Sequence, residues 1–262
     1  MTSWEGRVVF VTGGSSGIGR ACALKLGRLG AKIVLQFHSG HSRAEEVRSL
    51  LGDENIALFQ CDLSSAESLT SLFDRALSHF GKIDVFIHSA GVYEEQEPVE
   101  GLDVPTFMAQ WRRIMDLNLT GVAHLMALAS KYFANRIPTT SPSTPQAAII
   151  AIGSRGAYRG EPNAWAYGSS KAALHALIQS AAITLGPHGV VCAGVAPGFT
   201  NTPMAEASLS GKSGEAIMKQ SPWGRVALPE EVAHVVECVA RFWDTAFVSG
   251  TIVDVNGASY VH

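Results

Sequence analysis

The sequence predicts a single doubly wound α/β domain, in which helices cover both faces of a seven-stranded parallel sheet. Three observations lead to this prediction. The chain has 262 residues, enough for one large domain with a sizeable core. Short apolar runs rich in β-branched residues alternate with longer helical patterns, as in parallel sheets whose strands are joined by helices. A glycine-rich turn follows the first of these runs. With no internal repeat in the sequence, residues 1–262 are expected to form one domain.

Seven short apolar runs are expected to form the strands of the sheet. In chain order they are residues 7–12, 32–37, 56–60, 85–89, 147–153, 190–195 and 251–255. Six helical segments fall between them. Those at residues 106–134 and 165–185 are the longest, and each is apolar over more than one face.

Apolar periodicity and start signals locate several helices. The third helix is the clearest, because apolar residues recur there at intervals of three and four, namely Leu69, Leu72, Phe73, Ala76, Leu77 and Phe80. Ser64 with Glu67, and Ser42 with Glu45, match the capping-box pattern and predict the starts of the third and second helices. Pro229, followed by two glutamates, predicts the start of the last helix.

Two segments interrupt the alternation. Residues 138–146 are rich in Pro, Ser and Thr, so we expect an exposed, mobile connection there. Residues 197–225 follow the end of a strand, and a long connection in that position commonly forms a lid over the site.

Composition disfavours several classes of protein. The chain has 20 Lys and Arg against 23 Asp and Glu, so a basic nucleic-acid-binding face is not expected. The four cysteines, Cys22, Cys61, Cys192 and Cys238, are far apart, and the histidines form no ligand pair, so neither a disulfide framework nor a metal site is expected. No run approaches the length of a membrane span, and the first six residues are too short and polar for a signal peptide. We therefore expect a soluble, cytoplasmic protein.

Residues 12–19, Thr-Gly-Gly-Ser-Ser-Gly-Ile-Gly, follow the first strand and open a helix. Glycines allow a tight turn and a close approach to a pyrophosphate, and the N–H groups and dipole at a helix start favour negative charge. The spacing differs from Gly-x-Gly-x-x-Gly, and an ordinary glycine-rich turn is the plain alternative. The strand–turn–helix context favours dinucleotide binding. The expected contacts in this turn are Gly13, Ser15, Ser16, Gly17, Ile18 and Gly19.

Tyr167 and Lys171 are four residues apart in a segment with a helical pattern, which puts both side chains on one helix face. An ammonium group nearby is expected to lower the pKa of Tyr167 from about 10 toward the working pH, as a general acid/base requires. By itself this spacing is common and mostly structural.

The glycine pattern, with Thr12 before it, resembles that of the short-chain dehydrogenase/reductase family and of its 3-oxoacyl-ACP-reductase-like members, and the resemblance extends over nearly the whole chain. It implies a Rossmann-type fold and hydride transfer between a nicotinamide cofactor and a carbonyl or alcohol. Ser154 precedes Tyr167 by thirteen residues, as in the family, where the serine holds the substrate oxygen beside the tyrosine. Asn118 matches the family member that holds a water linking the lysine to solvent. Lys171 would also bind the nicotinamide ribose.

The resemblance implies further cofactor contacts. Asp62, after the third strand, would accept a hydrogen bond from the adenine amino group, although a turn aspartate beside a helix is the plain alternative. Ser89 stands where the family usually has an asparagine that ties neighbouring strands together, so we expect a weaker tie. Residues 197–202 resemble the segment that holds the nicotinamide carboxamide. The implied contacts are Asp62, Leu63, Ser89, Ala90, Gly91, Tyr167, Lys171, Pro197, Gly198, Thr200 and Thr202.

The end of the second strand favours NADP(H), with NAD(H) also possible. Enzymes that choose NAD usually have Asp or Glu about 20 residues after the glycines. Here residues 36–39 are Gln-Phe-His-Ser, and no Asp or Glu occurs between residues 6 and 44. His38 and Ser39, with Arg43 nearby, are expected to donate to a 2′-phosphate. Ser16 argues against this choice, because NADP-preferring relatives often have Arg or Lys there.

Three functions are compatible with these patterns: an oxidoreductase acting on a carbonyl or alcohol, a non-catalytic dinucleotide-sensing protein, and an enzyme of the same fold performing elimination or epimerisation. The set Asn118, Ser154, Tyr167 and Lys171 favours the first. Residues expected to line the substrate pocket are Tyr93, Arg155, Tyr158, Arg159, Trp165, Phe199 and Met204. They suggest a medium-sized, partly apolar ketone or alcohol. The two arginines would suit an anionic group, but loop arginines are more often solvated.

The two long helices predict a homo-oligomer. Their apolar residues extend beyond one stripe, and they include Leu125, Met126, Leu128, Leu174, Leu177 and Ile178. The family resemblance implies that the same two helices of another subunit cover them in a homotetramer or homodimer. Burial under the long loops is the alternative.

Overall fold

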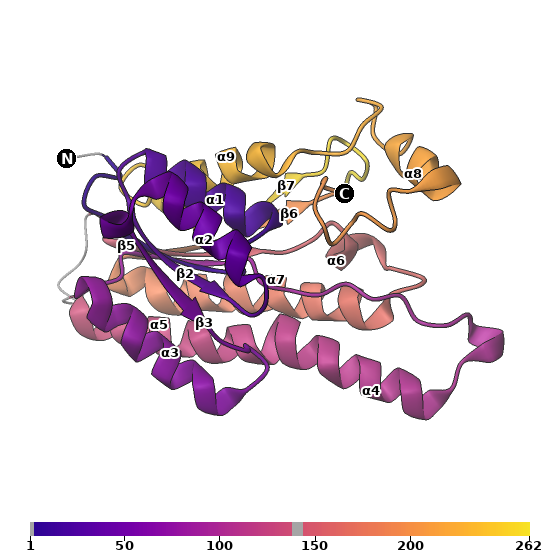
Figure 1. Cartoon of the computed structure of the whole chain (residues 1–262), viewed down its shortest axis with the longest axis horizontal. Coiled ribbons are helices and arrows are strands. Elements are labelled where there is room, and N and C mark those ends of the chain that lie inside the picture. Colours follow the sequence, from indigo (N-terminus) through magenta and orange to yellow (C-terminus); the bar gives the residue numbers. More distant parts are fainter. Residues whose placement is uncertain (1–2, 138–143) are drawn as a thin grey trace.

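A computed structural model describes residues 3–137 and 144–262 of the chain. Its strands are β1 (Val8–Thr12), β2 (Lys32–Phe37), β3 (Ile56–Gln60), β4 (Val85–His88), β5 (Ala147–Ile152), β6 (Val190–Pro197) and β7 (Ile252–Val255). They form one parallel sheet in the order β3-β2-β1-β4-β5-β6-β7 (Figure 1). The predicted doubly wound sheet is therefore confirmed, with strand ends within two residues of those expected.

Helices cover both faces of the sheet (Figure 1). On one face, α1 (Gly17–Arg28), α2 (His41–Leu51) and α9 (Pro229–Ala240) pack around Trp4 and the sheet. On the other face lie α3 (Ala66–Phe80), α5 (Gly121–Arg136) and α7 (Trp165–Leu185). The remaining helices are α4 (Val104–Met115), α6 (Gly156–Arg159) and α8 (Gly211–Met218). Single 3₁₀ turns occur at Asp53–Asn55, Val99–Gly101, Gly186–His188 and Ala246–Val248.

Two predicted helix starts are wrong. α3 begins after Ser65, and Ser64 donates its hydroxyl to Asp62 at 2.8 Å instead of capping the helix. α2 begins after Gly40, whose φ of +84° ends the preceding loop in the left-handed region, so Ser42 lies inside the first turn. In both cases the conformation of the residues before the helix, and not the capping-box pattern, determines where the helix begins. The start of α9 at Pro229 is confirmed.

The long helix predicted at residues 106–134 is interrupted. α4 ends at Met115, a π-helical turn spans Asp116–Thr120, and α5 continues from Gly121. A Cβ on Gly121 would overlap the carbonyl oxygen of Leu63, so glycine permits this close approach. π-Helical turns are frequently found at functional sites. This one contains Asn118, which is fully buried.

Residues 138–143 of the predicted mobile connection lie outside the described residues. Within the described parts of the chain, no helix combines the length and the apolar character needed to cross a membrane. The same parts contain no cluster of three or more His, Cys, Asp or Glu side chains able to hold a metal ion.

Candidate active site

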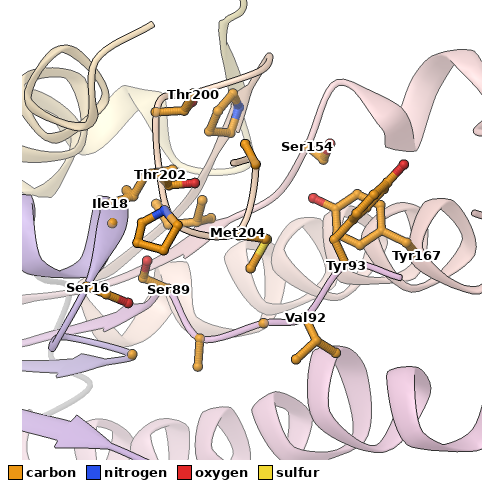
Figure 2. Close-up of a pocket in the computed structure, with 18 of the residues that line it drawn as sticks. Ser16, Ile18, Ser89, Val92, Tyr93, Ser154, Tyr167, Thr200, Thr202 and Met204 are labelled. Atoms are coloured by element: carbon orange, nitrogen blue, oxygen red, sulfur yellow. The ribbon is translucent and has the colours of Figure 1, made fainter. Parts of the chain in front are cut away.

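A cavity of about 350 Å³ lies at the carboxyl ends of the central strands, where parallel α/β sheets commonly bind ligands. Loops from opposite ends of the sequence line it. In Figure 2, Ser16 and Ile18 near the glycine-rich turn and Ser89 just after β4 lie on one side of the cavity, and Ser154, Tyr93 and Tyr167 lie on the other. The cavity is therefore long enough to join the predicted dinucleotide end to the predicted catalytic end.

The structure brings most of the predicted site residues to this cavity. Those that line it are Gly13, Ser15, Ser16, Gly17, Ile18, His38, Ser39, Leu63, Ser89, Ala90, Gly91, Ser154, Tyr167, Lys171, Pro197, Gly198, Thr200 and Thr202. Three predicted residues do not line it. Gly19 packs against the carbonyl of Gly13, and Asn118 lies buried beneath the cavity. Asp62 is exposed and accepts hydrogen bonds from the backbone N–H and hydroxyl of Ser64, which lower its pKa.

The start of α1 is suited to an anionic group. No acidic side chain occupies its first turn, and the N-cap Ser16 makes no side-chain bond to the helix. The first N–H groups of the helix and its dipole are therefore available to a phosphate in the adjoining cavity. Gly13 has φ of +65°, and a Cβ there would lie 2.8 Å from Cα of Ala90, so the turn needs glycine. These features fit a dinucleotide pyrophosphate.

Gln36 holds this turn in place. In the sequence this residue was noted only as part of a segment without Asp or Glu. Its Oε1 accepts from the N–H of Gly13 at 2.9 Å, and its Nε2 donates to the carbonyl of Cys61 at 2.7 Å. The side chain is almost fully buried. A polar residue within the apolar run Lys32–Phe37 was the sequence feature that could have indicated this role.

β1 and β4 are tied together through Thr12. Its hydroxyl oxygen lies 2.9 Å from Nδ1 of His88 and accepts from the N–H groups of Ser89 and Ala90 at 3.2 and 3.3 Å. The side chain of His88 therefore takes part in the link between β1 and β4, whereas Ser89 takes part through its backbone N–H only. Burial, followed by the charge of Lys171, lowers the pKa of His88 to about 3, so this imidazole is neutral at physiological pH.

Asn118 fastens the loop after β4 to the helix that carries Tyr167. Its Oδ1 accepts from the N–H of Val92 at 2.8 Å, and its Nδ2 donates to the carbonyl of Val92 at 2.9 Å. Nδ2 also lies 3.3 Å from the hydroxyl of Ser170 on α7. The π-helical turn thus points an amide side chain at two elements of the site.

Ser154, Tyr167 and Lys171 converge at the catalytic end of the cavity. Ser154 follows β5, and its hydroxyl accepts from the N–H of Gly156 at 3.0 Å. Lys171 lies one turn after Tyr167 on α7, is buried, and donates to the carbonyl of Ile152 at 2.9 Å. Its Nζ lies 5.8 Å from the centre of the Tyr167 ring.

The sequence predicted a lowered pKa for Tyr167, and this prediction is wrong, because the pKa is raised. Burial raises the pKa of Tyr167, and the negative charge of Glu161 raises it further, while a side-chain hydrogen bond with Ser154 opposes both effects. The ammonium of Lys171 donates to the carbonyl of Ile152. Burial also lowers the pKa of Lys171 to about 8.

His175, a residue that sequence analysis missed, lies behind Ser154. Its Nε2 accepts from the N–H of Ser154 at 3.4 Å, and a Cβ on Gly153 would overlap the same nitrogen. Burial, followed by the charge of Lys171, lowers the pKa of His175 to about 4, so it remains a neutral acceptor. Its position four residues after Lys171 on the buried face of α7 was the available signal.

The expected substrate residues divide into two groups. Tyr93, Arg155, Phe199 and Met204 line the cavity, whereas Tyr158, Arg159 and Trp165 do not. The ring of Tyr93 packs edge-on against Tyr167, with 5.0 Å between ring centres. The expectation of a solvated loop arginine is wrong for Arg155, which is buried with its guanidinium donating to Gln220 at 2.5 Å and to Ser259. Glu161 also lines the cavity and was not foreseen.

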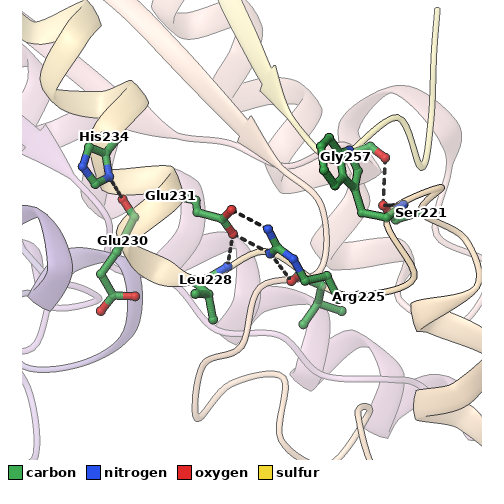
Figure 3. Close-up of polar contacts among 9 residues, drawn as sticks. Ser221, Arg225, Leu228, Glu230, Glu231, His234 and Gly257 are labelled. Carbon is green, nitrogen blue, oxygen red and sulfur yellow. Dashed lines mark hydrogen bonds and ion pairs between the residues drawn. The ribbon is translucent and has the colours of Figure 1, made fainter.

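The segment at residues 197–225 contacts the cavity and is anchored at its far end. Thr202, Met204 and Ser208 belong to the lining. At the other end, both guanidinium nitrogens Nη1 and Nη2 of Arg225 lie 2.7 Å from the carboxylate of Glu231, and Ser221 donates to the carbonyl of Gly257 at 2.8 Å (Figure 3). The segment is thus attached to α9 and to the C-terminal residues.

Comparison with known proteins identifies the family. The family model described as Enoyl-(Acyl carrier protein) reductase matches residues 13–258. The crystal structure of a short-chain dehydrogenase/reductase from Brucella melitensis, described as a glucose/ribitol dehydrogenase, is similar with a TM-score of 0.85 and 30% identity over 98% of both chains. This chain belongs to the short-chain dehydrogenase/reductase family.

Curated relatives in the family are similar over nearly their whole length. The chain is 35% identical over 254 residues to cis-4-hydroxycyclohexanecarboxylate dehydrogenase of Sinomonas cyclohexanicum, covering 96% of this chain and 95% of that protein. It is 30% identical to 3-oxoacyl-(acyl-carrier-protein) reductase of Synechocystis, with 98% of each chain covered. This short-chain dehydrogenase/reductase is therefore an oxidoreductase that transfers hydride between a nicotinamide cofactor and a carbonyl or alcohol group.

Proposed function

We propose that this short-chain dehydrogenase/reductase is an NADP(H)-preferring ketoreductase in which Tyr167 exchanges the proton at the substrate oxygen. The observation that carries the proposal is the convergence of Ser154, Tyr167 and Lys171 at one end of the cavity, with the glycine-rich turn at the other. The mixed lining, with Tyr93 and Met204, suits a medium-sized, partly apolar ketone or alcohol.

Each residue of the proposed catalytic set has a separate role. The hydroxyl of Ser154 holds the substrate oxygen beside the hydroxyl of Tyr167, which donates a proton to it in reduction and accepts one in oxidation. Lys171 supplies positive charge beneath the tyrosine and donates to the nicotinamide ribose. Asn118 holds the loop at Val92 and the water that returns protons to Lys171. The nicotinamide, when bound, supplies or accepts the hydride.

In this proposal the glycine-rich turn would hold the cofactor, and the N–H groups at the start of α1 would bind its pyrophosphate. The proposed contacts are those that the sequence predicts, including Gly19 and Asp62 beyond the cavity lining. Asp62 would have to turn from Ser64 to reach the adenine. Residues 197–225 would act as the lid over the nicotinamide and substrate.

The preference for NADP(H) is supported by the end of β2. His38, Ser39 and Arg43 all line the cavity there. The guanidinium of Arg43 folds over Gly40, so closely that a Cβ on this glycine would overlap it. A 2′-phosphate beside these three residues would meet hydrogen-bond donors and the positive charge of Arg43.

Replacing Ser39 with aspartate is expected to shift the ratio of kcat/KM for NADPH to kcat/KM for NADH toward NADH by about tenfold or more, because a carboxylate repels the phosphate and accepts from ribose hydroxyls. Steady-state kinetics with one ketone and both cofactors measures the ratio. Ser78→Asp on α3, outside the cavity, adds the same charge and should leave the ratio unchanged. A wild-type enzyme that favours NADH would contradict the proposed preference.

A spectrophotometric screen of carbonyl compounds tests the function itself. Oxidation of NADPH or NADH is followed with each ketone in turn, and turnover of at least one medium-sized ketone is expected. Tight cofactor binding without turnover of any ketone, or of any alcohol in the reverse direction, would favour the dinucleotide-sensing alternative.

A homotetramer, or failing that a homodimer, is the expected assembly. Some of the apolar residues that predicted it, Leu125, Met126, Leu174 and Ile178, are buried within the chain and do not support it. Exposed apolar side chains on α4 and α7 do, including Trp165 at 42% and Ile183 at 81% exposure. Light scattering at micromolar concentration should give a multiple of the 27.8 kDa chain mass. A stable monomer would refute the assembly.

A cytoplasmic location also belongs to the proposal. Cys22, Cys61 and Cys192 are buried and Cys238 is exposed, and each is a free thiol. Free thiols are typical of reducing compartments. Cell fractionation with a specific antibody would test the location.

A further inference from the structure

Glu161 occupies a space that Gly156 leaves beside Ser154 and packs next to Gly168. It lies in the loop between α6 and α7, and a Cβ on Gly156 would be 2.5 Å from its Oε1. A Cβ on Gly168 would be 3.5 Å from its Cβ. Gly156 is also the residue whose N–H donates to the hydroxyl of Ser154. The carboxylate of Glu161 is therefore held next to the turn that positions Ser154.

This carboxylate lacks a hydrogen-bond donor from the chain. Within residues 3–137 and 144–262, no N–H or O–H group donates to it. The nearest cation is Arg159, whose Nε lies 3.6 Å from Oε1, beyond hydrogen-bond distance. Arg155, at the start of α6, is directed to Gln220 and Ser259. An ionised carboxylate accepts about four hydrogen bonds, so its acceptor capacity is unused.

The unused acceptor faces the substrate end of the cavity. Glu161 lines the cavity together with Ser154 and Tyr167, and its side chain is only 16% exposed. Apart from the ion pair with Arg159, the carboxylate is open to a hydroxyl donor of a molecule bound in the cavity. Burial is the main cause that raises the pKa of Tyr93 and of Tyr167, and the negative charge of Glu161 adds to the rise in both.

We propose that Glu161 determines substrate specificity by accepting a hydrogen bond from a substrate hydroxyl close to the reacting carbonyl. The favoured substrates are then hydroxyketones and the corresponding vicinal diols. This inference rests on the proposed ketoreductase function and adds the class of substrate. A simple ketone would leave the carboxylate unsatisfied, and a site built to hydrogen-bond a hydroxyl discriminates against the analogue that lacks it. A carboxylate in the same position would be repelled.

The test compares ketones that differ by one hydroxyl group: 2-hydroxycyclohexanone with cyclohexanone, and 3-hydroxybutanone with butanone, each with NADPH and with NADH. For the wild-type enzyme, kcat/KM should favour the hydroxyketone by about tenfold or more. Glu161→Ala should bring the ratio near one while simple ketones are still reduced. Glu161→Gln, which keeps an acceptor without the charge, should give an intermediate ratio. Glu67→Gln, an exposed glutamate of α3, is the matched control and should keep the wild-type ratio.

The pH profile provides a readout that a purely structural role would not move. The titratable and charged groups near Tyr167 are Lys171 on the same helix, Tyr93 packed on its ring, and Glu161. Alcohol oxidation requires deprotonated Tyr167, so its rate rises as pH passes the pKa of this residue. Since Glu161 raises that pKa, Glu161→Gln should shift the rise to lower pH. An unshifted profile in a folded variant would count against the proposal.

The outcomes separate the two proposals. No turnover of any ketone with either cofactor would overturn the ketoreductase function and the inference with it. Equal kcat/KM for hydroxylated and simple ketones would overturn the inference alone. A preference for 4-oxocyclohexanecarboxylate over its methyl ester, abolished by Arg155→Gln and not by Glu161→Gln, would also overturn it in favour of an anionic substrate bound by Arg155.

Discussion

Replacing Tyr167 with phenylalanine is expected to abolish turnover while leaving the fold and cofactor binding intact. The substitution removes only the hydroxyl that exchanges the proton with the substrate oxygen. The ring remains packed against Tyr93, at 5.0 Å between ring centres, so the wall of the cavity is preserved. Loss of one general acid/base typically costs about 100-fold or more in rate. Steady-state kinetics gives kcat, and a thermal melt with and without cofactor checks folding and binding.

A matched control is available in Tyr132→Phe. The hydroxyl of Tyr132 lies on α5, outside the cavity, where it accepts from the N–H of Ile83 at 3.3 Å. Its removal should lower stability slightly and leave kcat unchanged. Near-normal kcat in Tyr167→Phe with any substrate would remove Tyr167 from the mechanism.

The second large effect is expected for Lys171→Ala, which should lower kcat and also raise the cofactor dissociation constant. One N–H of the buried ammonium is used by the carbonyl of Ile152, which leaves two for the cofactor ribose. Loss of a hydrogen bond from a charged group should weaken cofactor binding by about tenfold or more. Fluorescence titration with NADPH measures the constant, and single-turnover kinetics measures the chemical step.

Two further variants make the Lys171 result interpretable. Lys171→Met fills most of the buried volume, so a loss of cofactor affinity in both variants cannot be assigned to a cavity in the core. Lys131→Ala removes an exposed lysine of α5 and should change neither quantity. Unchanged cofactor affinity in both Lys171 variants would contradict the double role of this side chain.

The order of strands and helices was predictable because it depends on local patterns. Buried parallel strands require continuous apolar runs such as Ala147–Ile152, and amphipathic helices such as α3 show apolar residues at intervals of three and four. The wrong predictions concern helix starts and helix continuity, at positions where a contact with a neighbouring group outweighed the local sequence pattern. Ser64 matches a capping box but is bound by Asp62, and the π-helical turn at Asp116–Thr120 interrupts a continuous helical pattern.

The candidate site was predictable to the extent that spacing along one element determines it. Tyr167 and Lys171 share a helix face because they are four residues apart, and the family resemblance added Ser154 from another strand. Contacts between elements could not be foreseen in the same way. Gln36 was predicted only to lack a negative charge, whereas the structure uses it to join the turn at Gly13 to Cys61.

The sequence by itself determined the fold class, the family, and the residue types at the cofactor and catalytic ends, because each follows from periodicity or from a short motif. Only the tertiary structure decided which charges face the cavity. Arg155 and Glu161 lie on either side of α6 and both line the cavity, yet packing pairs the first with Gln220 and leaves the second without a hydrogen-bond donor from the described residues. It also decided the direction of the Tyr167 pKa, since burial and the charge of Glu161 outweigh the hydrogen bond from Ser154. Desolvation and electrostatic interactions depend on distances across the fold, and no interval along the chain specifies them.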